Sequence, residues 1–585
     1  MTGAGPERAF LGVETSLTGR RWIGPTGQED RLSEAMAQIT RLPLPLCRTL
    51  VRRGVAPDDA GRFLAPQLRD LLPDPMGLRD MGVAADRLLR AVNSRQRIAI
   101  LGDYDVDGGA SSALLIIWLR ALGQQATLYI PDRIDEGYGP NVPAMAALAR
   151  DHDLILCVDC GTLSHEPIAA ATGADVVVLD HHLGAETLPP ALAVVNPNRQ
   201  DEDGTLGHLC AASVVFLLLV EVNRRLRAAG VQGPDLMGML DLVALATVAD
   251  VAPLIGVNRA LVRQGLTVMA RRARPGLVAL ADVARMDRAP NCHALGFLLG
   301  PRVNAGGRIG RADLGARLLA TGDPAEAASI AARLDELNTE RRDIELRVRE
   351  AALAQARARG LDGPLVWAAG EGWHPGVVGI VAARLKEATN RPAVVIGLER
   401  GIGKGSGRSV SGVDLGAAVQ RLAAEGLLTR GGGHRMAAGL TVEEDRIEAA
   451  MARLGELLAR QGAGRGGAAD LRLDGLLMTG AATAQLVDQL EAAGPFGASA
   501  PAPRFAFADQ AVSARRVGET HLRLTLTDGM APPLEAIAFG AFDTALGPVL
   551  AQPGAQRFHL AGRLEISHWN GRSKVQLRLE DAARA

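Results

Sequence analysis

The feature that most constrains the fold is a series of short apolar runs that alternate with helical stretches. The runs are Ile98–Leu101, Leu154–Val158, Val176–Leu179 and Ala193–Val195, and helical stretches separate the first three. Parallel strands need crossover connections, so this alternation predicts an α/β fold with a parallel sheet. Hydrophobic residues form 48% of the 585-residue chain, which is enough to bury the cores of several domains.

Polar side chains follow three of these runs. The first run leads into Asp103-Tyr-Asp-Val-Asp107, the second into Asp159, and the third into Asp180-His-His182. In a parallel sheet the carboxyl ends of the strands share one edge, where ligands bind. Grouped carboxylates repel one another unless a cation lies between them, and Asp with His suits Mn²⁺ or Mg²⁺. The pattern therefore predicts a divalent metal site at this edge.

Asp250 is a fourth candidate ligand, because it follows the apolar run Leu242–Val248. A single Asp at the end of an apolar run can instead cap a helix, and this alternative applies to each of the four positions taken alone. The coincidence of three strand ends, two of them with several possible ligands, favours a metal site over capping.

The rest of the chain divides by similar patterns. A helix is expected near Asp30–Leu42, and a long solvated helix over Pro324–Arg359. A second α/β unit contains apolar runs at Leu365–Ala368 and Ala393–Ile396. After a glycine-rich linker, four short alternating runs predict a small β-barrel, and these are Leu522–Leu526, Leu534–Phe539, Phe558–Ile566 and Val575–Leu579.

Five regions follow from these patterns. We expect an N-terminal extension (1–75), a first α/β domain (76–323), a linking helix (324–360), a smaller second α/β domain (361–460) and a C-terminal barrel (468–585).

The overall composition bears on the binding partners and the cellular location of the protein. A formal net charge of −1 predicts no general affinity for nucleic acid, so any such affinity must come from local patches. Five scattered cysteines suit a reducing cytosol, and the single C-x-x-C of Cys157 and Cys160 lacks the second pair that a zinc ribbon needs. The chain shows no signal-peptide pattern and no uncharged apolar run of about 18 residues, so we expect a cytoplasmic protein without a membrane span.

The acidic motifs resemble those of the DHH phosphoesterase superfamily, which is named for the Asp180-His-His182 sequence. Supporting motifs in matching order cover roughly residues 40–580, and they are Pro131–Gly139, Thr247–Leu254, Gly300–Arg308, Gly372–Gly379, Lys404–Ser409 and Gly431–Gly439. The order is similar to that of bacterial superfamily members that degrade single-stranded DNA from the 5′ end. The resemblance implies a DHH domain joined by the long helix to a DHH-associated domain, with the barrel as an OB fold.

The resemblance also implies roles for individual residues. Six residues would hold two Mn²⁺ or Mg²⁺ ions, and they are Asp103, Asp105, Asp107, Asp159, His181 and Asp250. His182, with Asp180, would act beside the scissile phosphate. Leu101 stands where some relatives have a histidine, so Asp103 should matter more here. Two such metals can activate a water for in-line attack, which releases 5′-mononucleotides.

Arginines in glycine-rich segments suggest how the substrate phosphate is bound. Arg308 ends the segment Gly300–Arg308, which we interpret as a glycine-rich loop, and Arg408 lies in Gly405–Ser409. Glycines expose backbone N–H groups and arginine adds a bidentate fork, so together they predict a phosphate cradle. The resemblance assigns the 5′ phosphate end to Arg308, Ser406, Arg408 and His434, while surface turns remain the alternative.

Other residues are candidates for contact with the strand itself. Tyr138, beside Arg133 in a glycine-flanked loop, is a base-stacking candidate, although core packing is an equal alternative. Tyr104 is expected to pack under the carboxylate turn. Barrel side chains expected to fit an OB-fold groove are Arg515, Arg516, Arg523, Trp569 and Arg572.

Three functional hypotheses follow from the resemblance. The first is a metal-dependent 5′-to-3′ exonuclease on single-stranded DNA, acting in recombinational and mismatch repair as a monomer, with a single-strand-binding protein and a RecQ-type helicase as partners. The second is a phosphodiesterase for oligonucleotides or cyclic dinucleotides, but such relatives are shorter and lack the barrel. The third is a non-catalytic DNA-binding replisome scaffold, which is disfavoured because every ligand position holds a plausible donor.

Overall fold

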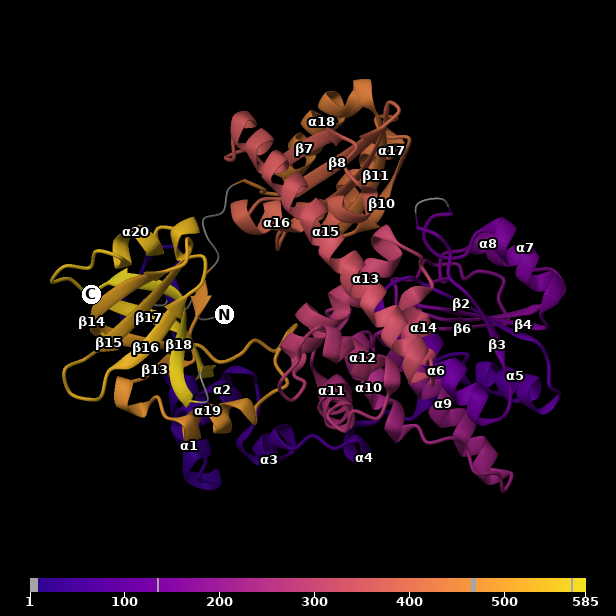
Figure 1. Ribbon diagram of the computed structural model, residues 1–585, viewed down its shortest axis with the longest axis horizontal. Helices are drawn as coiled ribbons and strands as arrows, with labels where there is room; N and C mark the ends of the chain where they lie inside the picture. Colours follow the sequence, from indigo (N-terminus) through magenta and orange to yellow (C-terminus); the bar gives the residue numbers. More distant parts are fainter. Residues whose placement is uncertain (1–8, 134–135, 465–469, 570–571) are drawn as a thin grey trace, which may run out of the picture. The chain divides into compact units, whose positions relative to one another are not determined.

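The computed structural model describes residues 9–133, 136–464, 470–569 and 572–585, and the side chains of Trp569 and Arg572 lie outside the described part. The chain divides into two compact units (Figure 1). One unit combines Met1–Asp70 with Gly466–Ala585, and the other is Leu71–Arg465. Within the described residues, no helix is both long enough and apolar enough to cross a membrane.

The first α/β domain is built on a five-stranded sheet in the order β3-β2-β4-β5-β6. All neighbouring strands in it are parallel, as predicted. Its strands are β2 (Ile98–Gly102), β3 (Ala126–Tyr129), β4 (Leu154–Val158), β5 (Asp175–Leu179) and β6 (Ala193–Val195). Strand β3 was not predicted, because it is an edge strand with only partly buried side chains and lacks the apolar run that marks the others.

Helices cover both faces of this sheet. Side chains of α7 (Val142–Asp151) and α8 (His165–Ala169) join one face of β2, β4 and β5 in a single hydrophobic cluster. The other helices of this part of the domain are α5 (Met81–Asn93), α6 (Val106–Ala121) and α9 (Ala211–Ala228). Helix α6 starts directly after the carboxylate-rich turn, so its first turn belongs to the candidate site.

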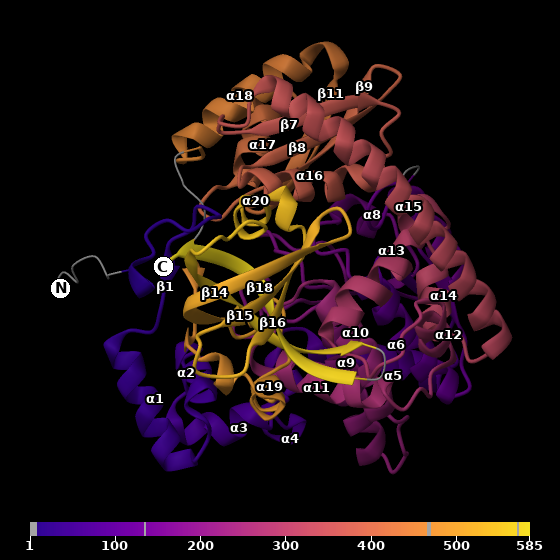
Figure 2. The ribbon, with the colours of Figure 1, turned by 60° about the vertical axis from the view of Figure 1, so that its left-hand side comes forward.

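A helical subregion follows the sheet and ends in the predicted long helix. Its elements are α10 (Leu240–Ala249), α11 (Gly256–Met269), α12 (Pro275–Val283), the π-helix η5 (Ala294–Leu299), α13 (Gly300–Ile309) and α14 (Leu314–Ala320). Asp323 caps the N-terminus of helix α15 (Pro324–Arg359), because its carboxylate accepts the N–H of Ala325. The helix ends before Gly360, which has a φ of 96°. It packs on α12 and α13 at one end and on α16 at the other (Figures 1 and 2).

The second α/β domain has a mixed sheet in the order β10-β11-β9-β8-β7. Its strands are β7 (Val366–Glu371), β8 (Ala393–Glu399), β9 (Ile402–Arg408), β10 (Arg430–His434) and β11 (Ala437–Glu443). Three helices pack on it, and they are α16 (Pro375–Thr389), α17 (Leu415–Ala424) and α18 (Ile447–Arg460). Strands β7 and β8 pair in parallel. The pairs β8 with β9 and β9 with β11 are antiparallel.

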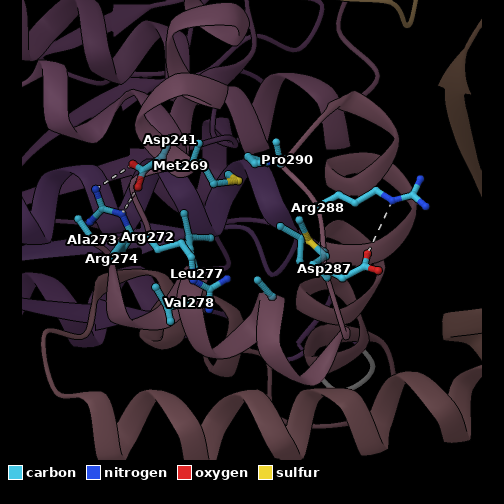
Figure 3. A pocket seen from close by; sticks show the side chains of 15 residues that line it. Asp241, Met269, Arg272, Ala273, Arg274, Leu277, Val278, Asp287, Arg288 and Pro290 are labelled. Atoms are coloured by element: carbon cyan, nitrogen blue, oxygen red, sulfur yellow. Dashed lines mark hydrogen bonds and ion pairs between the residues drawn. The ribbon is translucent and has the colours of Figure 1, made fainter. Parts of the chain in front are cut away.

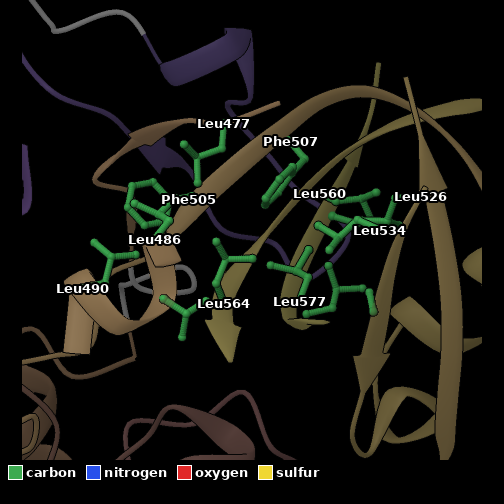
Figure 4. Packing of buried hydrophobic residues seen from close by; sticks show 14 of the residues in the cluster. Leu477, Leu486, Leu490, Phe505, Phe507, Leu526, Leu534, Leu560, Leu564 and Leu577 are labelled. Atoms are coloured by element: carbon green, nitrogen blue, oxygen red, sulfur yellow. The ribbon is translucent and has the colours of Figure 1, made fainter. Parts of the chain in front are cut away.

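The other unit contains the predicted barrel. Five strands close it because β14 pairs with both β15 and β17. They are β14 (Phe505–Val517), β15 (His521–Thr527), β16 (Leu534–Ala538), β17 (Arg557–Trp569) and β18 (Arg572–Arg584), and smaller elements are β13 (Gly475–Leu476), α19 (Ala484–Glu491) and α20 (Leu546–Leu550). Phe505, Phe507 and Phe558 are each at most 1% exposed in its core (Figure 4).

The N-terminal residues fold together with this barrel. Strand β1 (Trp22–Ile23) pairs in parallel with β12 (Leu471–Arg472), and the Trp22 indole donates to Asp581 Oδ2 at 2.9 Å. Side chains of α1 (Gly27–Thr40) and α2 (Leu44–Arg52) enter the barrel's hydrophobic cluster. Two short helices, α3 (Ala60–Leu64) and α4 (Leu68–Leu71), follow them. The helix expected near Asp30–Leu42 is therefore present as α1.

Candidate metal centre and arginine cluster

Three carboxylates lie side by side at the carboxyl edge of the first sheet. Register pairs Gly102 with Val158 and Val158 with Leu179, so the residues that follow these positions are aligned. Asp103, Asp159 and Asp180 follow β2, β4 and β5 directly, and all three are nearly fully buried. The strand ends thus deliver their carboxylates to one place, as the sequence pattern predicts.

Backbone N–H groups hold two further carboxylates of the first motif. Asp105 caps α6, since its Oδ1 accepts the N–H of Asp107 at 2.9 Å and of Gly108 at 3.1 Å. The two oxygens of Asp107 accept N–H groups of Ala211 and Ala212 at 2.8 Å or less, at the start of α9. Helix N-termini favour negative charge, so both carboxylates are oriented before any cation binds.

The possible ligands fall into two groups around Asp159 and His181. Ligand atoms lie within 4.8 Å of one another in each of two triads of predicted ligands, Asp103 with Asp105 and Asp159, and Asp107 with His181 and Asp250. A third group of the same kind joins Asp159 and His181 to His182. His181 Nε2 lies 3.3 Å from Asp159 Oδ1, which connects the triads. All six residues expected to bind metal are therefore brought together, whereas Leu101 is buried in β2 and contributes no ligand.

The ionised carboxylates of this cluster need a positive charge beside them. Burial, followed by repulsion from neighbouring carboxylates, raises the pKa of Asp103 and of Asp159 well above the usual range. The same causes raise the pKa of Asp250 to about 8. Asp159 Oδ1 is buried without a hydrogen-bond partner among the described residues. Oxygen donors with one imidazole fit Mn²⁺ or Mg²⁺, which would offset this repulsion and satisfy that oxygen.

Asp250 reaches the cluster from the end of a helix rather than from the end of a strand. It caps the C-terminus of α10, because Leu242–Val248 forms buried helix and not a strand. Val251 follows at φ 61° with its side chain 69% exposed, and Asp159 has φ 60°. Left-handed backbone is strained for both residue types, and such strain concentrates at functional sites.

Asp180 acts through its neighbours. Its Oδ2 accepts the N–H of Thr162 at 3.0 Å, and its Oδ1 accepts the N–H of His181 at 2.8 Å and His182 Nδ1 at 2.7 Å. Burial alone would lower the pKa of His182, but the hydrogen bond and charge of Asp180 outweigh it and raise that pKa to about 9. His182 is thus an imidazolium at neutral pH, held with its Nδ1 side toward Asp180.

Two asparagines that the sequence analysis missed fix the histidine pair. Asn196 Nδ2 donates to the carbonyl oxygen of His182 at 2.8 Å, and Asn198 Nδ2 donates to that of His181 at 2.6 Å. Both follow β6, at the same sheet edge as the aspartates. The signal that points to them is the Asn196-Pro-Asn198 sequence directly after the fourth apolar run.

A second cluster consists of arginines. Arg308 Nη1 donates to the carbonyl oxygen of Gly376 at 3.0 Å, and Arg408 Nη1 donates to Ser406 Oγ at 2.9 Å. Arg133 donates to the Tyr104 hydroxyl, with its guanidinium carbon 5.0 Å from that ring's centroid. Within the described part of the chain, none of these three arginines forms an ion pair with a carboxylate.

The arginines are close enough to repel one another. Burial lowers the pKa of Arg308 and of Arg408, and Arg133 lowers both further. Burial and the charge of Arg408 also lower the pKa of His434, so this imidazole is neutral at pH 7. A group of half-buried like cations that has no carboxylate partner among the described residues is a site for an anion.

The local structure of this cluster differs from the predicted glycine-rich cradle. Arg308 lies in the last turn of α13, not in a loop, and Ser406 and Arg408 lie in β9, not in a turn. Strand β9 pairs on both sides, so its amides are used within the sheet. Side chains, not glycine N–H groups, therefore make up this site.

Tyr138 lies beside the carboxylate and histidine cluster. The residue is 54% exposed, and its hydroxyl donates to the carbonyl oxygen of Asp159 at 2.9 Å and lies 3.2 Å from His182 Nε2. This exposure contradicts core packing. Tyr104 packs as expected, because a Cβ at Gly307 would come within 2.4 Å of its ring.

A separate cavity of about 320 Å³ lies beside α10 and α12 (Figure 3). Its polar wall is the pair of Arg274 and Asp241, which bind each other through two hydrogen bonds of 2.9 Å. None of the predicted site residues lines it. The candidate catalytic residues therefore lie at the carboxyl edge of the first sheet and not in this cavity.

Comparison with known proteins places these features in a family. Family models match three segments, the DHH family N-terminal domain at residues 97–247, the DHHA1 domain at 362–460 and the RecJ OB domain at 473–581. The single-stranded-DNA-specific exonuclease RecJ of Dickeya dadantii is 38% identical over 92% of this chain and 96% of its own length. The chain belongs to the RecJ family.

Other RecJ relatives extend the match. The RecJ exonuclease of Escherichia coli is 36% identical over 92% of this chain and 96% of its own length. The crystal structure of RecJ from Thermus thermophilus in complex with Mn²⁺ has a TM-score of 0.80 at 31% identity, covering 96% of this chain and 79% of that one. The complex with Mg²⁺ has a TM-score of 0.75 at 30% identity, covering 96% of this chain and 78% of that one. The α/β fold with an OB barrel is therefore that of RecJ.

Proposed function

We propose that this chain is a metal-dependent 5′-to-3′ exonuclease that hydrolyses single-stranded DNA to 5′-mononucleotides. The observation that carries the proposal is the pairing of a buried carboxylate and histidine cluster with a cluster of arginines that have no carboxylate partner among the described residues. The first cluster suits cations and the second suits phosphate. Membership of the RecJ family supports single-stranded DNA as the substrate.

We assign the metal ligands by the two triads. Asp103, Asp105 and Asp159 would hold one Mn²⁺ or Mg²⁺ ion, and Asp107, His181 and Asp250 the other. Bound divalent ions supply a deprotonated water at neutral pH and stabilise the charge of the leaving oxygen.

The chain's own residues position the substrate. Arg308 and Arg408, with Ser406, His434 and Arg133, bind the 5′-terminal phosphate and thereby align the first phosphodiester bond with the carboxylates. His182 donates Nε2–H to an oxygen of the scissile phosphate, and Asp180 keeps the imidazole charged and oriented. Capture of a terminal phosphate explains why cleavage starts at the 5′ end.

The biological setting follows the same proposal. The OB barrel is a platform for single strands, so it serves to hold the strand that leads away from the cut end. We assign the enzyme to recombinational and mismatch repair in the cytoplasm. We further propose that it acts as a monomer, with a single-strand-binding protein and a RecQ-type helicase supplying the substrate.

The decisive experiment follows a 5′- or 3′-labelled single strand in the presence of Mn²⁺. We expect mononucleotides from the 5′ end, no cleavage of blunt duplex, and loss of activity in Asp105→Ala. Asp287→Ala is the matched control, because that carboxylate is 87% exposed and lies outside both clusters. Release from the 3′ end, or full activity of Asp105→Ala, would contradict the proposal, as would a preference for cyclic dinucleotides.

A further inference from the structure

An exposed pair of aromatic rings lies close to the metal centre. Aromatic residues form only 3% of the chain, yet Phe297 is 67% exposed. Its ring stacks on that of His293, with 4.9 Å between centroids and 27° between planes. Ala294, Leu295 and Leu299 of the same π-helix are buried, so the helix is anchored by one face and presents these rings on another. Short π-helices are frequent at functional sites.

The π-helix contacts α10, and the residue that follows the π-helix approaches α6, so both neighbours carry metal-binding residues. A Cβ at Gly300, the residue after η5, would lie 3.2 Å from the side chain of Ala249 and 3.9 Å from that of Val106. Ala249 directly precedes Asp250, and Val106 directly follows Asp105. The exposed rings are therefore a few residues from the rim of the metal centre.

The arginine cluster is at the other end of α13. Phe297 precedes this helix and Arg308 lies in its last turn, roughly 16 Å apart along a helix axis. The charge of Arg308 acts on Asp103 and Asp105, whereas the π-helix approaches Asp250 through α10. Suppose that the 5′ phosphate of a DNA strand lies at the arginines and its first phosphodiester bond at the carboxylates. The DNA strand then continues toward Phe297.

We propose that Phe297, backed by His293, is a stacking platform for one nucleobase of the substrate, a few nucleotides to the 3′ side of the scissile bond. This rests on the proposed exonuclease function. Nucleobases stack on aromatic rings whatever the sequence, and paired bases inside a duplex are covered by their neighbours. The platform therefore adds affinity for single strands without base preference, at a distance from the groups that perform the chemistry.

The test uses 5′-phosphorylated strands that carry one abasic position, placed in turn from about the second to the eighth nucleotide. With wild-type protein, KM should rise about tenfold when the abasic position occupies the platform. Phe297→Ala should raise KM about tenfold on the intact strand, leave kcat within about twofold, and lose the effect of that one abasic position. Phe297→Trp should restore both.

Controls separate this role from folding and from the exonuclease assignment. Leu192→Ala removes a side chain of 45% exposure just before β6, at the opposite edge of the first sheet, and should behave as wild type. Binding of the same strands by fluorescence anisotropy in chelator makes the comparison without catalysis. Equal abasic profiles for wild type and Phe297→Ala would overturn the platform, and so would an altered oligomeric state of Phe297→Ala with unchanged DNA binding. Absence of cleavage by wild type would instead overturn the exonuclease.

Discussion

The two like-charged clusters of the larger unit are built in opposite ways. The carboxylates are held by backbone N–H groups, as when Asp107 accepts two amides at the start of α9. The arginines donate to carbonyl oxygens, a hydroxyl and an aromatic face, as when Arg308 binds the carbonyl oxygen of Gly376. Each cluster is thus supported by partners of opposite polarity. The described residues supply the His182 imidazolium to the carboxylates and no carboxylate to the arginines.

The difference between the two clusters corresponds to two functions, catalysis and phosphate binding. Helix N-termini fix the carboxylates before a cation arrives, so the acidic cluster is organised for the chemical step. The arginines come from three separate elements, and a phosphate would complete their hydrogen bonds. We therefore expect changes in the acidic cluster to lower kcat, and changes in the arginine cluster to raise KM and to alter the preference for the terminal group.

The largest effect should come from Asp159, which belongs to one triad and lies 3.3 Å from His181 of the other. Asp159→Asn should lower kcat by about a thousandfold or more, because the metals supply several kcal/mol of transition-state stabilisation. It should also remove the rise in melting temperature that Mn²⁺ gives to wild-type protein. Steady-state rates and thermal melts with and without Mn²⁺ measure both, and a variant that keeps its Mn²⁺-dependent shift would show that Asp159 is no ligand.

The same variant has the opposite effect on the metal-free protein. Because burial raises the pKa of Asp159, the folded state binds the proton more tightly than the unfolded state, so metal-free stability falls as pH rises above about 4. Asp159→Asn removes this loss. Its metal-free melting temperature should exceed that of wild type at neutral pH and match it near the acid end of the folded range. A lower neutral-pH value for the variant would contradict the electrostatic account.

The acidic cluster lay within reach of sequence reasoning because the signal is local. Asp103, Asp159 and Asp180 each come directly after a buried strand, so the parallel-sheet pattern alone placed them at one edge. Asp250 carries a weaker signal, since it follows an apolar run that forms helix α10 and lies at the C-terminus of that helix. Asn196 was missed because its contact is to a backbone carbonyl, which leaves no charge pattern in the sequence.

The arginine cluster shows where such reasoning fails. Glycine-rich segments suggested turns, but these glycines allow close packing inside regular elements. A Cβ at Gly307 would lie 2.4 Å from the Tyr104 side chain, and one at Gly407 would lie 2.7 Å from the Leu415 side chain. The pairing of β1 with β12 was equally unpredictable, because two residues from each end of the chain carry too little pattern to reveal a ladder.

The second-largest effect should come from the arginine cluster. Arg408→Gln should lower kcat/KM on 5′-phosphorylated strands by about 10- to 100-fold, the value of one or two charge-assisted hydrogen bonds. Arg408→Lys keeps the charge but not the planar fork, so it should fall between wild type and Arg408→Gln. Assays on matched 5′-phosphate and 5′-hydroxyl strands provide the comparison. Equal losses on both strands would place Arg408 away from the terminal phosphate.

A smaller, pH-dependent effect should distinguish Asp180 from the metal ligands. The pKa of His182 is raised to about 9, so its imidazolium persists below that pH and activity should decline above it. Asp180→Asn removes the charge partner and should move this alkaline decline toward the ordinary histidine pKa of about 6.5, with about a tenfold loss at pH 8. The kcat profile from pH 6 to about 10 measures the shift. His182→Gln should show no histidine-dependent decline, and an unmoved decline in Asp180→Asn would refute the coupling.

The smallest effect tests whether the two clusters bind their counterions independently. Sulfate at about ten times its dissociation constant should stabilise the folded state by about 1.4 kcal/mol, or a few degrees at most for a domain of this size. Because the clusters are separate, the shift should add to that produced by Mg²⁺ and survive in Asp159→Asn. It should vanish in the double variant of Arg308→Gln and Arg408→Gln, which keeps the Mg²⁺ shift. Thermal melts with each ion alone and with both decide the matter, because a sulfate shift that requires Mg²⁺ would mean that the anion binds at the metal centre and not at the arginines.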